Sequence, residues 1–241
     1  MPDPTAERRA LVRQGLAIGV ATGLYGTSFG AVGVASGLSV LQTCALSFLV
    51  FTGASQFAFV GVLAAGGSPW SGAATGLMLG ARNTLYGLGL ADRLRWRGLR
   101  RAGAAQLVID ESSAVATVQD DRPLARLGFL VTGGAVFVLW NLMTFVGALA
   151  GTALGDPRTF GLDAAVGAAF LALLWPRLAD GSAVAVALAA GALALALVPF
   201  TPAGVPVLAA ASVAVVAALL PTRTPPGSGA SGASGASGAA A

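Results

Sequence analysis

The stretch GAATGLMLGARNTLYGLGLA (72–91) decides how this chain folds, because it is an apolar run of membrane-spanning length with an arginine in its middle. A transmembrane helix needs about 20 predominantly apolar residues. A charge at the centre of such a helix costs roughly 2.5–3.5 kcal/mol on insertion scales unless it is paired or hydrated. Arg82 is therefore expected to face the interior of a helical bundle or a water-filled cavity.

A second stretch, AAQLVIDESSAVATV (104–118), carries two adjacent carboxylates, Asp110 and Glu111, among apolar residues. One cation and two carboxylates at membrane depth point to a site for a zwitterion or a proton. The other interpretation is a structural ion pair that fixes the register of two helices. The two interpretations are compatible, and the sequence leaves both open.

The composition places the rest of the chain in a membrane as well. Of the 241 residues, 56% are hydrophobic and 10% are charged, whereas soluble domains carry about 25% charged residues. Six or seven apolar stretches approach the length of a span, and no regular ten-residue alternation typical of a β-barrel is present. These features predict an all-α, polytopic helical bundle in a bacterial inner membrane, with lipid as its surroundings.

The charge pattern favours a membrane orientation signal over nucleic-acid binding. The net charge is +4, every cation is arginine, and histidine is absent. Five arginines gather in DRLRWRGLRR (92–101), and basic residues in short loops usually mark the cytoplasmic side. Without histidine, any coupled proton has to be carried by a carboxylate. The single cysteine excludes C-x-x-C motifs, and no phosphate loop or metal cluster stands out, so we expect neither an enzyme nor a cofactor.

The chain divides by composition into a basic N-terminus, a membrane domain and a tail. The tail is rich in proline, glycine, serine and alanine and is expected to be disordered. The predicted boundaries are 1–13 for the N-terminus, 14–221 for the membrane domain and 222–241 for the tail. Within the membrane domain we expect a first helical group (14–91), a basic loop (92–103), a short amphiphilic segment with a polar loop (104–126) and a second helical group (127–221).

The arginine distribution conflicts with simple crossings in the first half. An N-terminus inside and three full crossings would put the five-arginine loop outside. Either the N-terminus is outside, or an early segment is broken or re-entrant, as in many transporters. The candidates are the glycine-dense stretch 15–37 and the stretch that carries Ser55 and Gln56, and 104–119 also resembles a half-helix that enters and returns. The glycines at steps of three and four instead predict close helix packing.

Several local strings carry a resemblance to one family. They are GASQF (53–57), ARNTLYGLGL (81–90), IDESSAVA (109–116), WNLMTFVGALAG (140–151) and GLDAAVGAAFLALLWP (161–176). Together they resemble the AzlC-type branched-chain amino acid permeases. The resemblance implies export of branched-chain amino acids across the inner membrane, commonly with a small AzlD-type membrane subunit as partner.

The chemistry of a branched-chain amino acid suggests a role for each polar residue at depth. The planar guanidinium of Arg82 can hold a carboxylate, and Asp110 or Glu111 can accept an ammonium or carry a proton. The neutral candidates are Ser55 and Gln56 as a polar wall at a helix break, Phe57 in an apolar pocket, Asn83 and Tyr86 beside Arg82, and Trp140 lining the site. Gln56 as interhelical glue, and Phe57 and Trp140 as packing residues, remain open alternatives.

These residues predict a secondary transporter that exports branched-chain or related apolar amino acids. The proton gradient is the expected energy source, because no nucleotide-binding motif is present. The alternative is a non-transporting membrane scaffold or complex subunit, in which the charges only pair helices.

Overall fold

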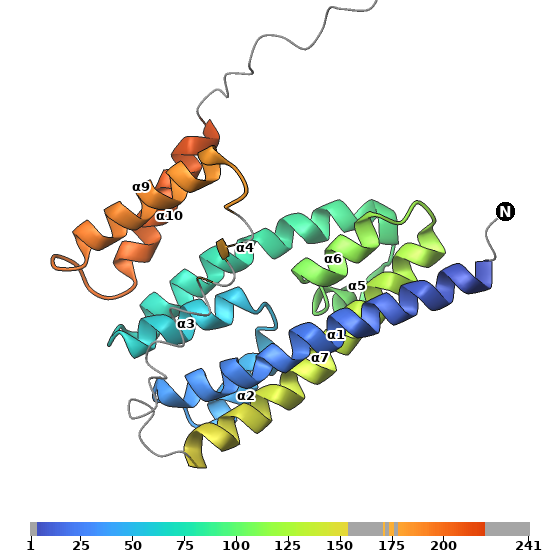
Figure 1. The fold of residues 1–241 in the computed structure, drawn as a ribbon, viewed down its shortest axis with the longest axis horizontal. Coiled ribbons are helices and arrows are strands. Elements are labelled where there is room, and N and C mark those ends of the chain that lie inside the picture. The colour runs from blue at the N-terminus through green and yellow to red at the C-terminus, as the bar shows by residue number, and fades with distance from the viewer. Residues whose placement is uncertain (1–3, 154–170, 172–173, 176–177, 220–241) are drawn as a thin grey trace, which may run out of the picture.

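The computed structural model describes residues 4–153, 171, 174–175 and 178–219, and all of its regular elements within these ranges are helices (Figure 1). The predicted all-α fold is confirmed. Most of the predicted segment 160–176 and the whole predicted tail lie outside these residues. The helices are α1 (Pro4–Ala35), α2 (Val40–Leu49), α3 (Ala54–Ala64), α4 (Pro69–Leu94), α5 (Gly98–Ala105), α6 (Asp110–Thr117), α7 (Arg122–Ala153), α9 (Gly181–Leu197) and α10 (Val205–Leu219).

Helices α1 and α7 form a long parallel pair that lies side by side (Figure 1). Within the described ranges they are the two helices long and apolar enough to cross a membrane. The glycine face of α1 lies against α7: a Cβ on Gly26 would stand 2.6 Å from the Trp140 carbonyl oxygen, and one on Gly30 would stand 2.6 Å from the Ala148 nitrogen. The predicted close packing is confirmed, and the alternative of a broken first segment is wrong because α1 is continuous.

Helices α2 and α3 form a hairpin that extends into the helical bundle from the end at which α1 stops. Helix α2 runs antiparallel to α7, and the Ser47 hydroxyl donates to Thr144 Oγ1 at 3.3 Å. The chain then breaks at residues 50–53, where Gly53 adopts φ 63°. Helix α3 returns along α4, with Phe59 against Gly72. The early break therefore lies immediately before Ser55 and Gln56, one of the two places that the sequence suggested.

Helices α5 and α6 form a second hairpin, which extends into the bundle from the opposite end, where α4 stops. The chain breaks again at residues 106–109, and α6 runs back antiparallel to α7, with Val115 against Gly128. The predicted entry and return is present, but its bounds differ from the predicted 104–119: the break and α6 lie within that stretch, whereas the entering helix α5 lies mostly in the predicted basic loop 92–103. The two tips touch, since Gln106 Nε2 donates to the Phe48 carbonyl oxygen at 2.7 Å.

The two hairpins remove the conflict in the arginine distribution. Because α2 and α3 turn back, α4 ends beside the start of α7: Arg126 Nε donates to the Leu94 carbonyl oxygen at 2.8 Å, and Arg93 donates to the Gln119 carbonyl oxygen. The parallel α1 starts at that end too. The arginines in the first turns of α1, in the segment 92–101 around the junction of α4 and α5, and at the start of α7 therefore share one end of the molecule, here called the basic end.

Helices α9 and α10 pack against each other, and the turn before α10 reaches the start of α4, with Gly204 beside Ser71. Asp180 caps the N-terminus of α9. Hydrogen bonds from the Ser182 hydroxyl and then from the Ala183 N–H lower the pKa of the Asp180 carboxyl from its ordinary value. This cap lies far in sequence from the charged stretches, and it fixes where α9 begins.

Candidate substrate site

A small cavity of about 70 Å³ lies where the two hairpin tips meet α1, α4 and α7; it is called the tip cavity below. Each hairpin contributes the end of its break and the first residues of its second helix. The lining residues are Thr22 and Tyr25 of α1, Phe51, Thr52, Gly53, Ala54 and Phe57 of the first hairpin, Arg82 of α4, Ile109, Asp110 and Glu111 of the second hairpin, and Val136 and Trp140 of α7.

The three charges predicted at membrane depth converge on this cavity. Arg82 Nη1 lies 3.3 Å from Asp110 Oδ2, and the two side chains are 29% and 32% exposed. This ion pair joins α4 to α6, as the structural interpretation of the charges predicts. Glu111 lines the same cavity, and its Oε1 accepts a long hydrogen bond of 3.5 Å from the Thr22 hydroxyl. The cavity thus contains one ion pair and one further carboxylate.

The second helix of each hairpin begins at the cavity, so the N-termini of α3 and α6 converge there. A helix N-terminus carries roughly half a positive charge and favours anions. Both helices begin in the same way: the Gly53 N–H donates to Gln56 Oε1 at 3.1 Å, and the Ile109 N–H donates to the Ser112 hydroxyl oxygen at 3.2 Å. Ala54 of α3 and Asp110 and Glu111 of α6, the first residues of these helices, line the cavity.

Three buried hydrogen-bond donors belong to residues that line the cavity. The Tyr25 hydroxyl, Arg82 Nε and Trp140 Nε1 have no hydrogen-bond partner within the described part of the chain. Trp140 is only 3% exposed. Most buried polar groups in proteins are hydrogen-bonded, so each exception needs an explanation. Three such donors around one cavity indicate a position that an acceptor-rich ligand or water occupies.

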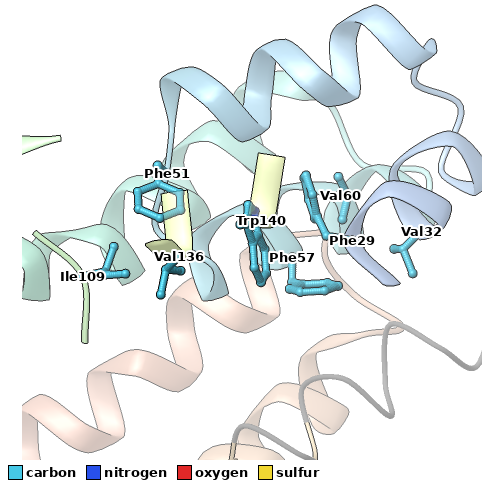
Figure 2. Close-up of a cluster of buried hydrophobic side chains, with 8 residues drawn as sticks. All are labelled: Phe29, Val32, Phe51, Phe57, Val60, Ile109, Val136 and Trp140. Atoms are coloured by element: carbon cyan, nitrogen blue, oxygen red, sulfur yellow. The ribbon is translucent and has the colours of Figure 1, made fainter. Parts of the chain in front are cut away.

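Aromatic rings form the apolar side of the cavity. The ring centroids of Tyr25 and Phe57 lie 5.6 Å apart, and those of Tyr25 and Trp140 lie 6.2 Å apart. Phe29 packs edge-on against Phe57 at 5.4 Å behind them. Figure 2 shows Phe29, Phe57 and Trp140 close together, with Phe51 of the first tip to one side of them. The arrangement offers charge on one side and an apolar wall on the other.

The structure brings five of the nine predicted site residues together at the tip cavity: Phe57, Arg82, Asp110, Glu111 and Trp140. Ser55 and Gln56 do not line it. Gln56 is fully buried and fastens the break of the first hairpin, since its Nε2 donates to the Leu46 carbonyl oxygen at 3.1 Å. Ser55 packs against Gly76 and Gly80 of α4.

Asn83 and Tyr86 also lie away from the tip cavity, although they are close to Arg82 in sequence. Asn83 Nδ2 donates to the Val108 carbonyl oxygen at 3.0 Å and so holds the second tip against α4. Sequence reasoning missed Tyr25 and Thr22 of α1. Their signal is weak, because both sit in the glycine-dense stretch, whose pattern indicates packing.

A second, larger cavity of about 420 Å³ lies beside the tip cavity and is called the basic-side cavity below. Phe51 and Thr52 of the first tip line both cavities and therefore form part of the wall between them. Asn83, Arg101 and Gln106 supply polar groups to the larger cavity, and Leu88, Leu94, Trp96 and Phe129 supply apolar surface.

The comparison with known families covers all of these elements. The AzlC protein family matches residues 17–154, which include both hairpins and every residue of the tip cavity. The chain belongs to the AzlC family. It is 33% identical over 132 residues to the inner membrane protein YgaZ of Escherichia coli (strain K12), a match that covers 53% of this chain and 54% of YgaZ.

The chain thus spans about half the length of the curated relative it matches. No solved structure matches it. Family membership confirms the resemblance predicted from the sequence strings, and the predicted location in the inner membrane is confirmed as well.

Proposed function

We propose that this AzlC-family protein is a secondary transporter that exports branched-chain or related apolar amino acids and uses the proton gradient. The observation that carries the proposal is the tip cavity, where an ion pair, a further carboxylate, unpartnered donors and an aromatic wall meet at two helix breaks. Broken helices that surround a midplane site are a recurrent feature of secondary transporters.

Each part of an apolar amino acid has a matching group in the cavity. The substrate carboxylate is bound by Arg82, by the unpartnered donors of Tyr25 and Trp140, and by the N-termini of α3 and α6. A carboxylate of the second tip accepts the ammonium. The apolar side chain packs against Phe57 and its aromatic neighbours, which favours a branched aliphatic group over a charged one.

The tip cavity and the basic-side cavity differ in volume, and this difference bears on the route by which substrate enters. The tip cavity, at 70 Å³, is well below the range of about 300–1,000 Å³ that is usual for ligand pockets, so it is too small for a branched-chain amino acid in this conformation. The basic-side cavity, at 420 Å³, falls within the usual range for ligand pockets. We infer that substrate enters from the basic end and that Phe51 and Thr52 move to admit it. Closure of the first tip behind the substrate then gives alternating access.

The family resemblance also supports a small AzlD-type subunit as partner, and we include that subunit in the proposal.

The alternative function is a membrane scaffold whose charges only pair helices. The Arg82–Asp110 ion pair favours that alternative, because it links α4 to α6 without any ligand. The unpartnered donors of the cavity favour the transporter, since a purely structural core gains nothing from leaving them unsatisfied.

Leucine and valine flux from preloaded vesicles, with and without a proton gradient, tests the proposal. The wild type is compared with Arg82→Gln and with Arg97→Gln, a matched charge change in the exposed basic loop. A transporter loses gradient-dependent flux in Arg82→Gln while the protein still inserts, and it keeps flux in Arg97→Gln. A scaffold shows no flux in any variant and loses assembly in Arg82→Gln. If wild type is silent, co-expression of the small subunit must restore flux; otherwise the proposal is wrong.

A further inference from the structure

The two adjacent carboxylates of the second tip have different surroundings. Asp110 pairs with Arg82 at 3.3 Å. Glu111 has no cation within ion-pair distance in the part of the chain that the structure describes, and its hydrogen bond from Thr22 is long, at 3.5 Å. The sequence alone could not assign separate roles to these neighbours, whereas the ion pair distinguishes them.

From this difference we propose that Glu111 exchanges one proton for the ammonium of one substrate molecule, so that the protein is a one-for-one proton/amino acid antiporter. The inference rests on the proposed function and adds the exchanging residue and the stoichiometry. Asp110, in contrast, keeps Arg82 oriented toward the cavity throughout the cycle.

The surroundings of Glu111 leave it two stable states. The polar and charged groups that line the cavity with it are Thr22 and Tyr25 of α1, Thr52 of the first tip, Arg82 of α4, Trp140 of α7 and its neighbour Asp110, and the cation among them is engaged by Asp110. Apart from Thr22, the hydrogen-bond donor to its carboxylate is its own backbone N–H. A lone carboxylate at membrane depth is costly, and such groups are neutral or paired in proteins. Glu111 is therefore either protonated or bound to a cation that a ligand brings.

These two states exclude each other and give a balanced exchange. In the empty site the Glu111 carboxyl holds a proton. When substrate binds, the carboxyl O–H bond breaks, the proton leaves to water on the side that is open, and the carboxylate oxygen accepts a hydrogen bond from the substrate ammonium. Release of substrate on the other side reverses the step with a proton from that side. No oxidant, reductant or other co-reactant takes part.

The loaded site contains the full charges of its residues and substrate together with the partial charges of two helix N-termini. With Arg82, Asp110 and Glu111 charged and a zwitterion bound, the site has one more negative than positive charge. The N-termini of α3 and α6 both border the cavity, and each supplies roughly half a positive charge. These partial charges favour the substrate carboxylate, whereas the substrate ammonium supplies the full cation that Glu111 otherwise lacks. Over one cycle, one proton moves inward and one net-neutral amino acid moves outward, so the exchange is electrogenic.

The stoichiometry makes a quantitative prediction. In proteoliposomes with a pH gradient of one unit and the membrane potential clamped at zero, one-for-one exchange supports at most about a tenfold leucine ratio. The experiment uses the full chain, with its small subunit if wild-type flux requires it, and records leucine with a label and protons with a pH-sensitive dye. The variants are Glu111→Gln, Asp110→Asn and, as a matched control, Asp121→Asn in the exposed loop before α7.

The expected results separate the residues. Wild type and Asp121→Asn reach the tenfold ratio and move one proton per leucine. Glu111→Gln loses leucine-driven proton movement and the accumulation, and its residual leucine affinity no longer varies with pH. Asp110→Asn binds leucine more weakly but still moves one proton per leucine. A merely structural Glu111 would leave both the proton count and the pH dependence unchanged.

Other outcomes overturn the inference in distinguishable ways. If Glu111→Gln keeps one proton per leucine, the inference fails while the proposed function stands. If wild type moves no leucine even with the small subunit, both fail. If Glu111→Gln does not insert, Glu111→Asp decides: one-for-one coupling with a shifted pH dependence supports the inference, and an unshifted one contradicts it.

Discussion

Replacing Tyr25 with phenylalanine removes a single hydroxyl from the tip cavity and nothing else. In the structure this hydroxyl is buried and has no hydrogen-bond partner among the described residues. A buried unpaired polar group costs about 1–3 kcal/mol. Tyr25→Phe is therefore expected to leave the stability of the ligand-free protein unchanged or to raise it by up to that amount.

The effect on transport has the opposite sign. In the proposed substrate complex the Tyr25 hydroxyl donates to the substrate carboxylate, and hydrogen bonds to charged groups contribute about 1.5–3 kcal/mol. Loss of this bond weakens leucine binding by about 10- to 150-fold. The variant thus loses affinity without losing stability, a combination that a packing defect does not produce.

The assay measures the leucine concentration dependence of flux together with the thermal unfolding of the purified protein. Tyr86→Phe is the matched control, because Tyr86 is the other of the two tyrosines of the chain and lines neither cavity. It should change neither quantity. An unchanged leucine affinity in Tyr25→Phe refutes a ligand role for the hydroxyl, and a clear loss of stability shows that the hydroxyl has an internal partner instead.

Three further predictions concern packing, the ion pair and a helix cap. Gly30→Ala places a methyl group against the backbone of α7 and should lower the stability measured by thermal unfolding by about 1–3 kcal/mol. Gly134→Ala, which has open space around it, is the control and should be neutral or stabilising by up to about 1 kcal/mol. Arg82→Gln or Asp110→Asn alone leaves an unpaired charge that costs roughly 2.5–3.5 kcal/mol. The double variant should regain this stability but not the flux that Arg82→Gln loses, and regained flux would show that the charges are only structural. Because the folded-state pKa of Asp180 is lowered, the stabilisation that its carboxylate gives to the start of α9 is complete above the ordinary pKa of 3.8 and is lost as pH falls through the lowered pKa. Amide exchange of the first turn of α9 between pH 2 and 6 should show this loss. Asp180→Asn should abolish the pH dependence of that exchange.

Much of the site could be predicted from the cost of charge in a bilayer. Arg82, Asp110 and Glu111 stand out because each is expensive at membrane depth, and the same argument brings them together. The opposed directions of the hairpins were partly accessible, since an N-terminus on the same side as the five arginines of 92–101 requires an even number of crossings before residue 92. The sequence could not choose between the glycine stretch and the Ser55–Gln56 stretch, because glycine serves both close packing and helix breaks.

The neutral residues were harder to place for a physical reason. Helical spacing says which residues share a face, but it does not say which neighbour that face meets. Asn83 follows Arg82 directly, yet its amide is taken by the Val108 carbonyl oxygen of the second tip. Gln56 looks like a ligand, yet its two ends bond the backbone of its own hairpin. Tyr25 was invisible in the glycine pattern and became a candidate only when α7 brought Trp140 beside it.

The central claim, that substrate occupies the tip cavity, is tested most directly by cysteine accessibility. Cys44 is the single native cysteine, so Cys44→Ser gives a clean background for Ala54→Cys in the tip cavity and Thr84→Cys in the basic-side cavity. The rate of modification by a small membrane-impermeant thiol reagent is measured with and without saturating leucine. The account predicts that leucine protects Ala54→Cys at least about tenfold. Full reactivity of Ala54→Cys in a variant that still transports leucine would contradict it.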